Sequence, residues 1–107
     1  MTSLTPLHQA ILEVGLEDLI PLPELLGTPE VRAAVVGEPT VEEVGDALVD
    51  LLRLGRVSVW CGHWPEEPRR TSGKEAEGLL LDSRRYTFDG ETEGIERVYF
   101  VNAENIP

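Results

Sequence analysis

The hydrophobic period of the chain changes at Gly55, and this change limits the possible folds more than any other feature. Before it, segment 41–54 repeats apolar residues at helical spacing, and Thr40 with Glu43 matches the Thr-x-x-Glu pattern of a capping box. After it, "RVSVWC" alternates and is rich in β-branched residues, which predicts a strand at about 56–61. A helix ending at a glycine and leading directly into a strand predicts a fold of the α+β class.

The N-terminal part predicts further short helices. Threonine followed by proline begins two of them, at Thr5 and at Thr28, because threonine caps a helix and proline fits its first position. Gly15 and Gly37 are the expected ends. Between the two, the prolines of "IPLP" exclude helix interior, so a short extended segment is expected near 20–22 and a short helix from Pro23.

A long connection follows the first strand. "GHWPEEPRRTSG" is typical of a loop, and "SGKEAEGLLLDS" predicts a short helix in which Ser72 and Glu75 form a second capping box. "IERVYFVN" predicts a strand at about 95–102, antiparallel to the first, with Val98 and Phe100 in the core. The two strands should cover one face of the helices, about 35 residues apart, far more than a hairpin loop needs.

This order of elements resembles the winged helix-turn-helix domain. The segment "VEEVGDALVDLLRLGRVSVW" is similar to the capped helix and first wing strand of that family, and "GLEDLIPLPELLG" is similar to its first strand and second helix. The resemblance implies one winged-helix-like domain over residues 1–107. Its helical part would be 1–55, and an elaborated wing hairpin with a long insertion and a short helix would be 56–107.

Length and composition favour a small soluble domain of bacterial type. The 107 residues fit a single domain with one modest core. No basic region followed by an apolar run marks a signal peptide, and no apolar stretch approaches the roughly 20 residues of a membrane helix. One cysteine cannot form an internal disulfide. We therefore expect a cytoplasmic protein that does not bind a membrane.

Charge is the strongest compositional signal. The net charge is −11, and residues 1–50 hold ten acids against a single base, Arg32. Such a surface repels phosphate backbones and attracts basic proteins. The charge profile is similar to that of small acidic inhibitors, such as immunity proteins that neutralise basic nuclease toxins. The sequence thus favours a non-enzymatic protein-binding module, with a basic protein as the partner that fits its charge. The candidate binding residues are Glu42, Glu43, Asp46, Asp50, Trp60 and Trp64.

The alternative is a winged-helix transcription regulator that binds DNA as a homodimer. In that family the long helix before the wing commonly enters the major groove, but here this helix carries four carboxylates. A basic wing is the remaining route to DNA, and the other interpretation of its bases is ion pairing with the acidic body. The candidate nucleic-acid-binding residues are Arg53, Arg56, Arg69, Arg70, Lys74, Arg84 and Arg85.

The segment "WCGHW" gathers rare residues without forming a recognisable chemical site. Cys61 and His63 could supply two metal ligands, whereas a structural zinc site needs four. As a nucleophile and base they lack a third, orienting group. The sequence therefore predicts no catalytic residue, no metal site and no cofactor. Trp60 should face away from the core, either covered by the helix near 70–82 or exposed as a binding anchor.

Overall fold

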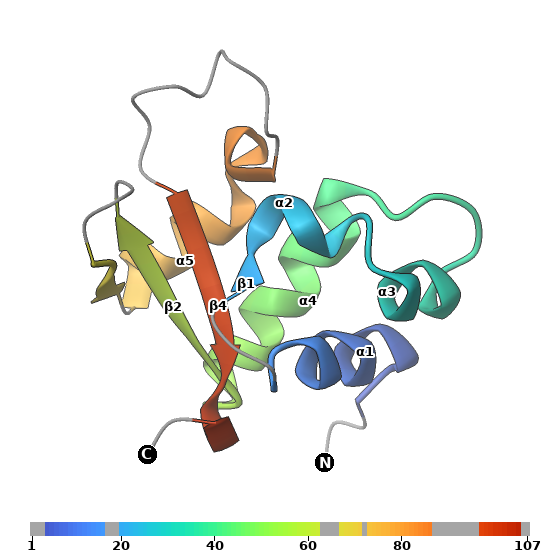
Figure 1. The fold of residues 1–107 in the computed structure, drawn as a ribbon, viewed down its shortest axis with the longest axis horizontal. Coiled ribbons are helices and arrows are strands. Elements are labelled where there is room, and N and C mark those ends of the chain that lie inside the picture. Colours follow the sequence, from blue (N-terminus) through green and yellow to red (C-terminus); the bar gives the residue numbers. More distant parts are fainter. Residues whose placement is uncertain (1–3, 17–19, 63–66, 72, 87–96, 106–107) are drawn as a thin grey trace.

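The computed structural model describes residues 4–16, 20–62, 67–71, 73–86 and 97–105. Within these residues the chain forms five α-helices, two 3-10 helices and a four-stranded antiparallel sheet, so the predicted α+β class is confirmed (Figure 1). The elements are α1 (Pro6–Val14), β1 (Ile20–Pro21), α2 (Leu22–Leu25), α3 (Pro29–Ala34), α4 (Val41–Arg53), β2 (Val57–Gly62), β3 (Arg69–Thr71), α5 (Gly73–Leu81), η1 (Ser83–Tyr86), β4 (Arg97–Asn102) and η3 (Ala103–Asn105).

The sheet has the strand order β1-β4-β2-β3. The predicted antiparallel pair, β2 with β4, forms its centre, with Val59 opposite Phe100. The prediction of a loop through Arg69–Thr71 is wrong, because these residues pair with β2 as the edge strand β3. Their local composition does not favour a strand; the pairing does, and the Thr71 hydroxyl reinforces it by donating to the Val59 carbonyl at 3.0 Å.

One face of the sheet packs against the helices. Cys61 lies opposite Val98, and both are at most 1% exposed, as is Phe100, so the predicted core positions of Val98 and Phe100 are confirmed. Helix α4 meets this face with its apolar stripe, which follows from the helical spacing read in the sequence. The fully buried residues of that stripe are Val44, Leu48 and Leu51.

The helix caps differ in detail from the expected ones. At α1 the Thr5 hydroxyl accepts from the His8 amide at 3.2 Å, and the His8 ring accepts from the Thr5 amide at 3.0 Å, which completes a capping box with histidine. At α4 the Thr40 hydroxyl accepts from the Glu43 amide at 3.1 Å as predicted. The second half of that box was wrong, because the Glu43 carboxylate accepts from the Thr40 hydroxyl and not from its amide.

Three smaller expectations about the helices also change. The Thr28 side chain does not cap α3 but donates to the Leu25 carbonyl, and α3 ends at Ala34, before Gly37. Helix α2 begins at Leu22, one residue before the expected Pro23. The predicted cap at Ser72 lies outside the described residues.

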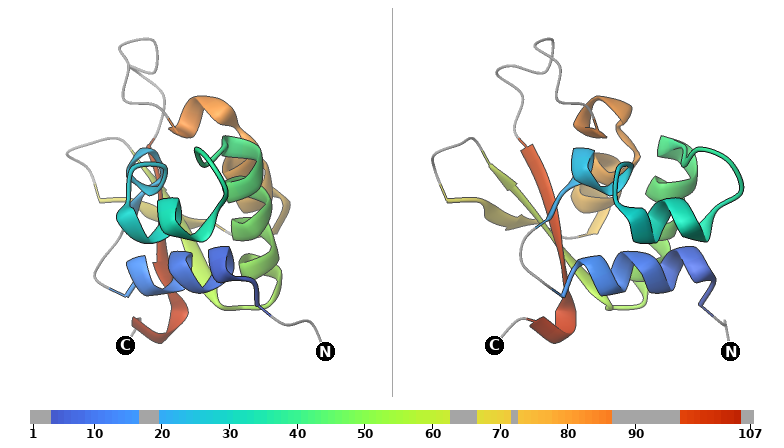
Figure 2. Two further views of the ribbon diagram at one scale, coloured as in Figure 1. Left: turned by 90° about the vertical axis from the view of Figure 1, so that its right-hand side faces the viewer. Right: turned by 45° about the vertical axis from the view of Figure 1, so that its right-hand side comes forward.

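The described helices of the connection between β2 and β4, α5 and η1, pack against α4. Helix α5 packs beside α4 (Figure 2), and an added Cβ at Gly45 would lie 2.8 Å from the Leu80 carbonyl oxygen. The buried Tyr86 hydroxyl donates to the same carbonyl at 2.5 Å, and burial, with the nearby Asp46 charge, raises the pKa of Tyr86 above its usual value. These contacts fasten the C-terminal end of α5 to the N-terminal half of α4.

In the part of the chain that the structure describes, no helix has the length and apolar character required to cross a bilayer.

Candidate functional site

Four carboxylates form the outward side of α4, which we call the acidic face: Glu42, Glu43, Asp46 and Asp50. All four residues are exposed. At 3.6 residues per turn they fall within roughly 100° of the helix circumference. Among the ion pairs between described residues, none joins a lysine or arginine to this face. The acidic face is therefore a concentrated, solvent-facing negative charge on a rigid helix.

Helix α1 borders the acidic face through His8. The Thr5 amide donates to Nδ1 of this ring, so Nε2 carries the hydrogen and donates to Asp50 Oδ2 at 3.2 Å. The Asp50 side chain nevertheless remains 58% exposed. His8 thus fixes the direction of one carboxylate without covering it.

Arg53 closes the C-terminal end of the acidic face. Its Nη2 lies 2.6 Å and its Nε 3.0 Å from Glu77 Oε1 on α5. The guanidinium at the C-terminal end of α4 is thereby held against α5. This ion pair is exposed, so it orients the two helices more than it stabilises them.

Three other candidate arginines pair with carboxylates of their own segment. Arg69 lies 3.2 Å from Glu75, and Arg84 and Arg85 both contact Asp82, at 2.9 and 3.4 Å. Hydrogen bonds from Arg84 lower the pKa of Asp82 below its usual value. These arginines do form ion pairs, but the expected partner, the acidic body, is wrong for the pairs described: the partner acids are Glu75 of α5 and Asp82 just after it.

The remaining bases are scattered. Arg56 is partly buried just before β2, Arg70 is exposed on β3, and Lys74 is exposed on α5. The seven candidate bases therefore come from α4, the turn after it, β3, α5 and η1. Among the described residues, four of them form ion pairs with carboxylates: Arg53, Arg69, Arg84 and Arg85.

Trp60 lies on the face of the sheet that points away from the helices, as predicted. The register places it between Tyr99 on β4 and Arg70 on β3. Helix α5 packs against α4, and the two alternatives for Trp60, cover by the helix near 70–82 or exposure as a binding anchor, stay predictions. The Trp60 ring is partly buried, and its indole N–H is buried without a hydrogen-bond partner in the described structure. Trp64 lies outside the described residues.

Of the Cys-x-His pair, the structure describes only Cys61. Cys61 is 1% exposed and faces the core, whereas His63 lies outside the described residues. Among the described side chains, no group of three histidine, cysteine, aspartate or glutamate residues is placed to hold a metal ion. That the chain has no metal site therefore stays a prediction.

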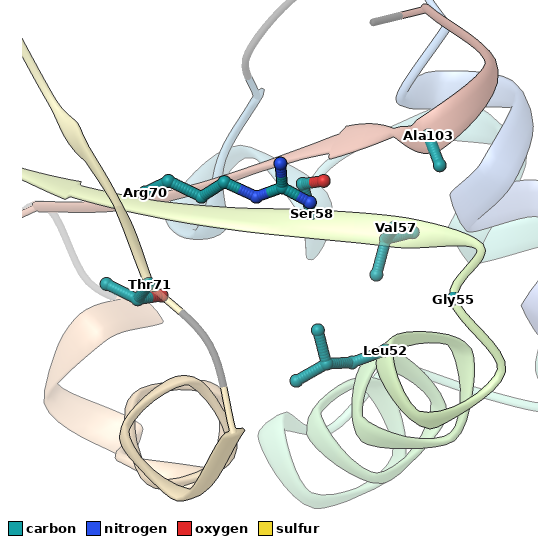
Figure 3. Close-up of a pocket in the computed structure, with 7 residues that line it drawn as sticks. All are labelled: Leu52, Gly55, Val57, Ser58, Arg70, Thr71 and Ala103. Carbon is teal, nitrogen blue, oxygen red and sulfur yellow. The ribbon is translucent and has the colours of Figure 1, made fainter.

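A pocket opens at the edge of β2, where β3 ends (Figure 3). Its volume is about 350 Å³, near the lower end for ligand sites. Leu52 and Val57 form one side, and Ser58 and Arg70 lie across the strand from them. Gly55, Thr71 and Ala103 complete the lining. Only Arg70 of these residues was a candidate from the sequence.

Two residues that shape the acidic face were missed in the sequence. His8 stands three residues after Thr5, the place of the glutamate in a capping box, and this spacing was a usable signal. Gly45 interrupts the best helix pattern of the chain, which costs about 1 kcal/mol relative to alanine and so indicates a close approach. Its partner, the Leu80 carbonyl, could not be identified from spacing alone.

Comparison with known proteins finds no match: no family model, no curated protein and no solved structure is similar to this chain.

Proposed function

We propose that the chain is a non-enzymatic protein-binding module that uses the acidic face of α4 to hold a basic partner. The observation that carries this proposal is the set of four exposed carboxylates on one side of α4, a helix whose opposite side is buried in the core. Such a face accelerates the encounter with a basic protein and disfavours acidic ones.

Winged-helix architecture is part of the proposal. The order β1-β4-β2 and the succession of α1, β1, two short helices and α4 support it. In this interpretation α4 corresponds to the helix that commonly enters the major groove. Its carboxylates and the neighbouring α5, which occupies one flank of the helix, support a protein partner over DNA.

An inhibitor of immunity or antitoxin type is the sharpest form of this proposal. The features that support it are the small size, the net charge of −11 and the gathering of acids on one rigid helix. A basic nuclease is a partner of matching charge, since its nucleic-acid-binding surface is itself selected to attract negative charge.

The proposal predicts which protein the chain retains from a lysate of its source cell. With the protein immobilised, we expect a bound partner whose isoelectric point is above about 9 and whose elution requires added salt. The variant Glu42→Gln with Glu43→Gln and Asp46→Asn should lose this partner, because it removes three charges from the acidic face.

A second variant of equal net charge serves as the control. Glu13→Gln, Glu24→Gln and Glu30→Gln change three exposed acids outside the acidic face and should leave retention intact. Equal loss of the partner in both variants would attribute binding to net charge and not to α4. An acidic or neutral partner that survives the substitutions on α4 would contradict the proposal.

A further inference from the structure

Along β2, the backbone N–H and C=O groups of successive residues point alternately toward β4 and toward β3. Two hydrogen bonds show which residues point to which side. The Arg56 carbonyl accepts from the Ala103 amide at 2.9 Å, on the β4 side. The Val59 carbonyl accepts from the Thr71 hydroxyl at 3.0 Å, on the β3 side. Since backbone groups repeat every two residues along a strand, the amide and carbonyl of Val57 also point to the β3 side.

In the part of the chain that the structure describes, the pairing of β3 with β2 ends before Val57. Strand β3 pairs with β2 only as far as Thr71, which lies opposite Val59, and α5 begins at Gly73 and packs against α4. No described strand therefore pairs with Val57 on this side. The pocket of about 350 Å³ occupies the same place, where the next residues of an edge strand would lie (Figure 3).

The two walls of this pocket differ in chemistry. On the side of the helices, the lining is apolar and is formed by the partly buried Leu52 and the buried Val57. On the other side, the exposed Arg70 side chain extends along β2 toward Ser58. Among the ion pairs between described residues, none includes Arg70.

We propose that this edge pocket binds an extended peptide segment of a partner protein, in which an acidic residue stands between two apolar ones. The segment would add to β2 at Val57 through main-chain hydrogen bonds, as in β-strand addition. Because successive side chains of a strand point to opposite faces, the two apolar side chains would contact Leu52 and Val57 while the acidic one meets Arg70. This site is separate from the acidic face and takes the opposite charge.

The charge of the protein makes the preference for an acidic segment a demanding prediction. With a net charge of −11, the overall field favours a basic peptide. Only a local contact with Arg70 reverses that preference. The volume of the pocket accommodates a segment of two or three residues, so affinity for an isolated peptide is expected to be weak.

The test is an NMR titration of the whole isotope-labelled protein with two acetylated, amidated pentapeptides, Thr-Val-Glu-Val-Thr and Thr-Val-Lys-Val-Thr. We expect the glutamate peptide to shift the Val57 amide resonance and to bind at least about threefold more tightly than the lysine peptide, the size of one exposed ion pair. Arg70→Ala should abolish this preference.

Lys74→Ala is the matched control, because it removes one exposed positive charge that does not line the pocket. It should retain the preference for glutamate, and thermal unfolding checks that both variants are folded. Absence of any saturable shift at Val57, or equal binding of the two peptides, would overturn the proposal. Loss of the preference in Lys74→Ala as much as in Arg70→Ala would also overturn it.

Discussion

Gly45→Ala is expected to destabilise the protein by about 1–3 kcal/mol, although alanine is the better helix former. The added Cβ would lie 2.8 Å from the Leu80 carbonyl oxygen, 3.5 Å from the Leu81 side chain and 3.6 Å from the Tyr86 hydroxyl. The first of these is a backbone atom and cannot rotate away. The substitution should therefore push the end of α5 from α4, and a lower midpoint of urea unfolding measures the loss.

Gly78→Ala on α5 separates this contact from helix propensity. Gly78 is exposed, and nothing lies within 4 Å of its added Cβ. Both substitutions gain the same propensity, so Gly78→Ala should stabilise the protein by about 0.5–1 kcal/mol. If the two variants moved the urea midpoint in the same direction, the close packing of α5 against α4 would be wrong.

Charge reversal on the acidic face should have the largest effect on binding. We expect Glu42→Lys with Glu43→Lys and Asp46→Lys to slow association with the proposed basic partner by at least about 100-fold, since steering by a charged surface contributes factors of 10 to 1,000. The dissociation rate should change less, because exposed charges act mainly on encounter. Stopped-flow association kinetics at several salt concentrations measure both rates.

Two controls keep this result interpretable. The triple reversal Glu13→Lys, Glu24→Lys and Glu30→Lys changes the net charge equally at exposed positions outside the acidic face, so it should slow association far less. Lysines at the start of a helix also oppose its dipole, at about 0.3–1 kcal/mol each, so urea unfolding must show that the variant remains folded. If both triple variants slowed association equally, the acidic face of α4 would not be the binding site of the partner.

Local sequence patterns were enough to predict the larger elements. Helix α4, the change of period at Gly55, the pairing of β2 with β4 and the buried position of Phe100 all follow from spacing, because each buries an apolar stripe or an alternating face. The short helix α5 was predicted for the same reason, from Leu80 and its neighbours.

Contacts between distant segments account for what the sequence did not predict. Arg69–Thr71 becomes a strand only because β2 has a free edge, and no local signal marks that. The position of α5 on α4 depends on a missing side chain at Gly45 meeting a carbonyl 35 residues away. The carboxylates of α4 can be identified from the sequence. The ion pair of Arg53 with Glu77 cannot, because it joins two helices whose packing is not evident from local spacing.

Fluorescence anisotropy with a labelled 30-base-pair duplex at low salt tests the central claim most directly. We expect no saturable DNA binding up to about 50 µM protein, a concentration within the roughly 1–100 µM range of ordinary non-specific dissociation constants. The reasons are the exposed carboxylates of α4, the ion pair of Arg53 with Glu77 and the packing of α5 on α4. Saturable, salt-dependent binding that Arg70→Ala with Lys74→Ala abolishes would contradict the account. It would favour the alternative function, DNA binding through Arg70 and Lys74.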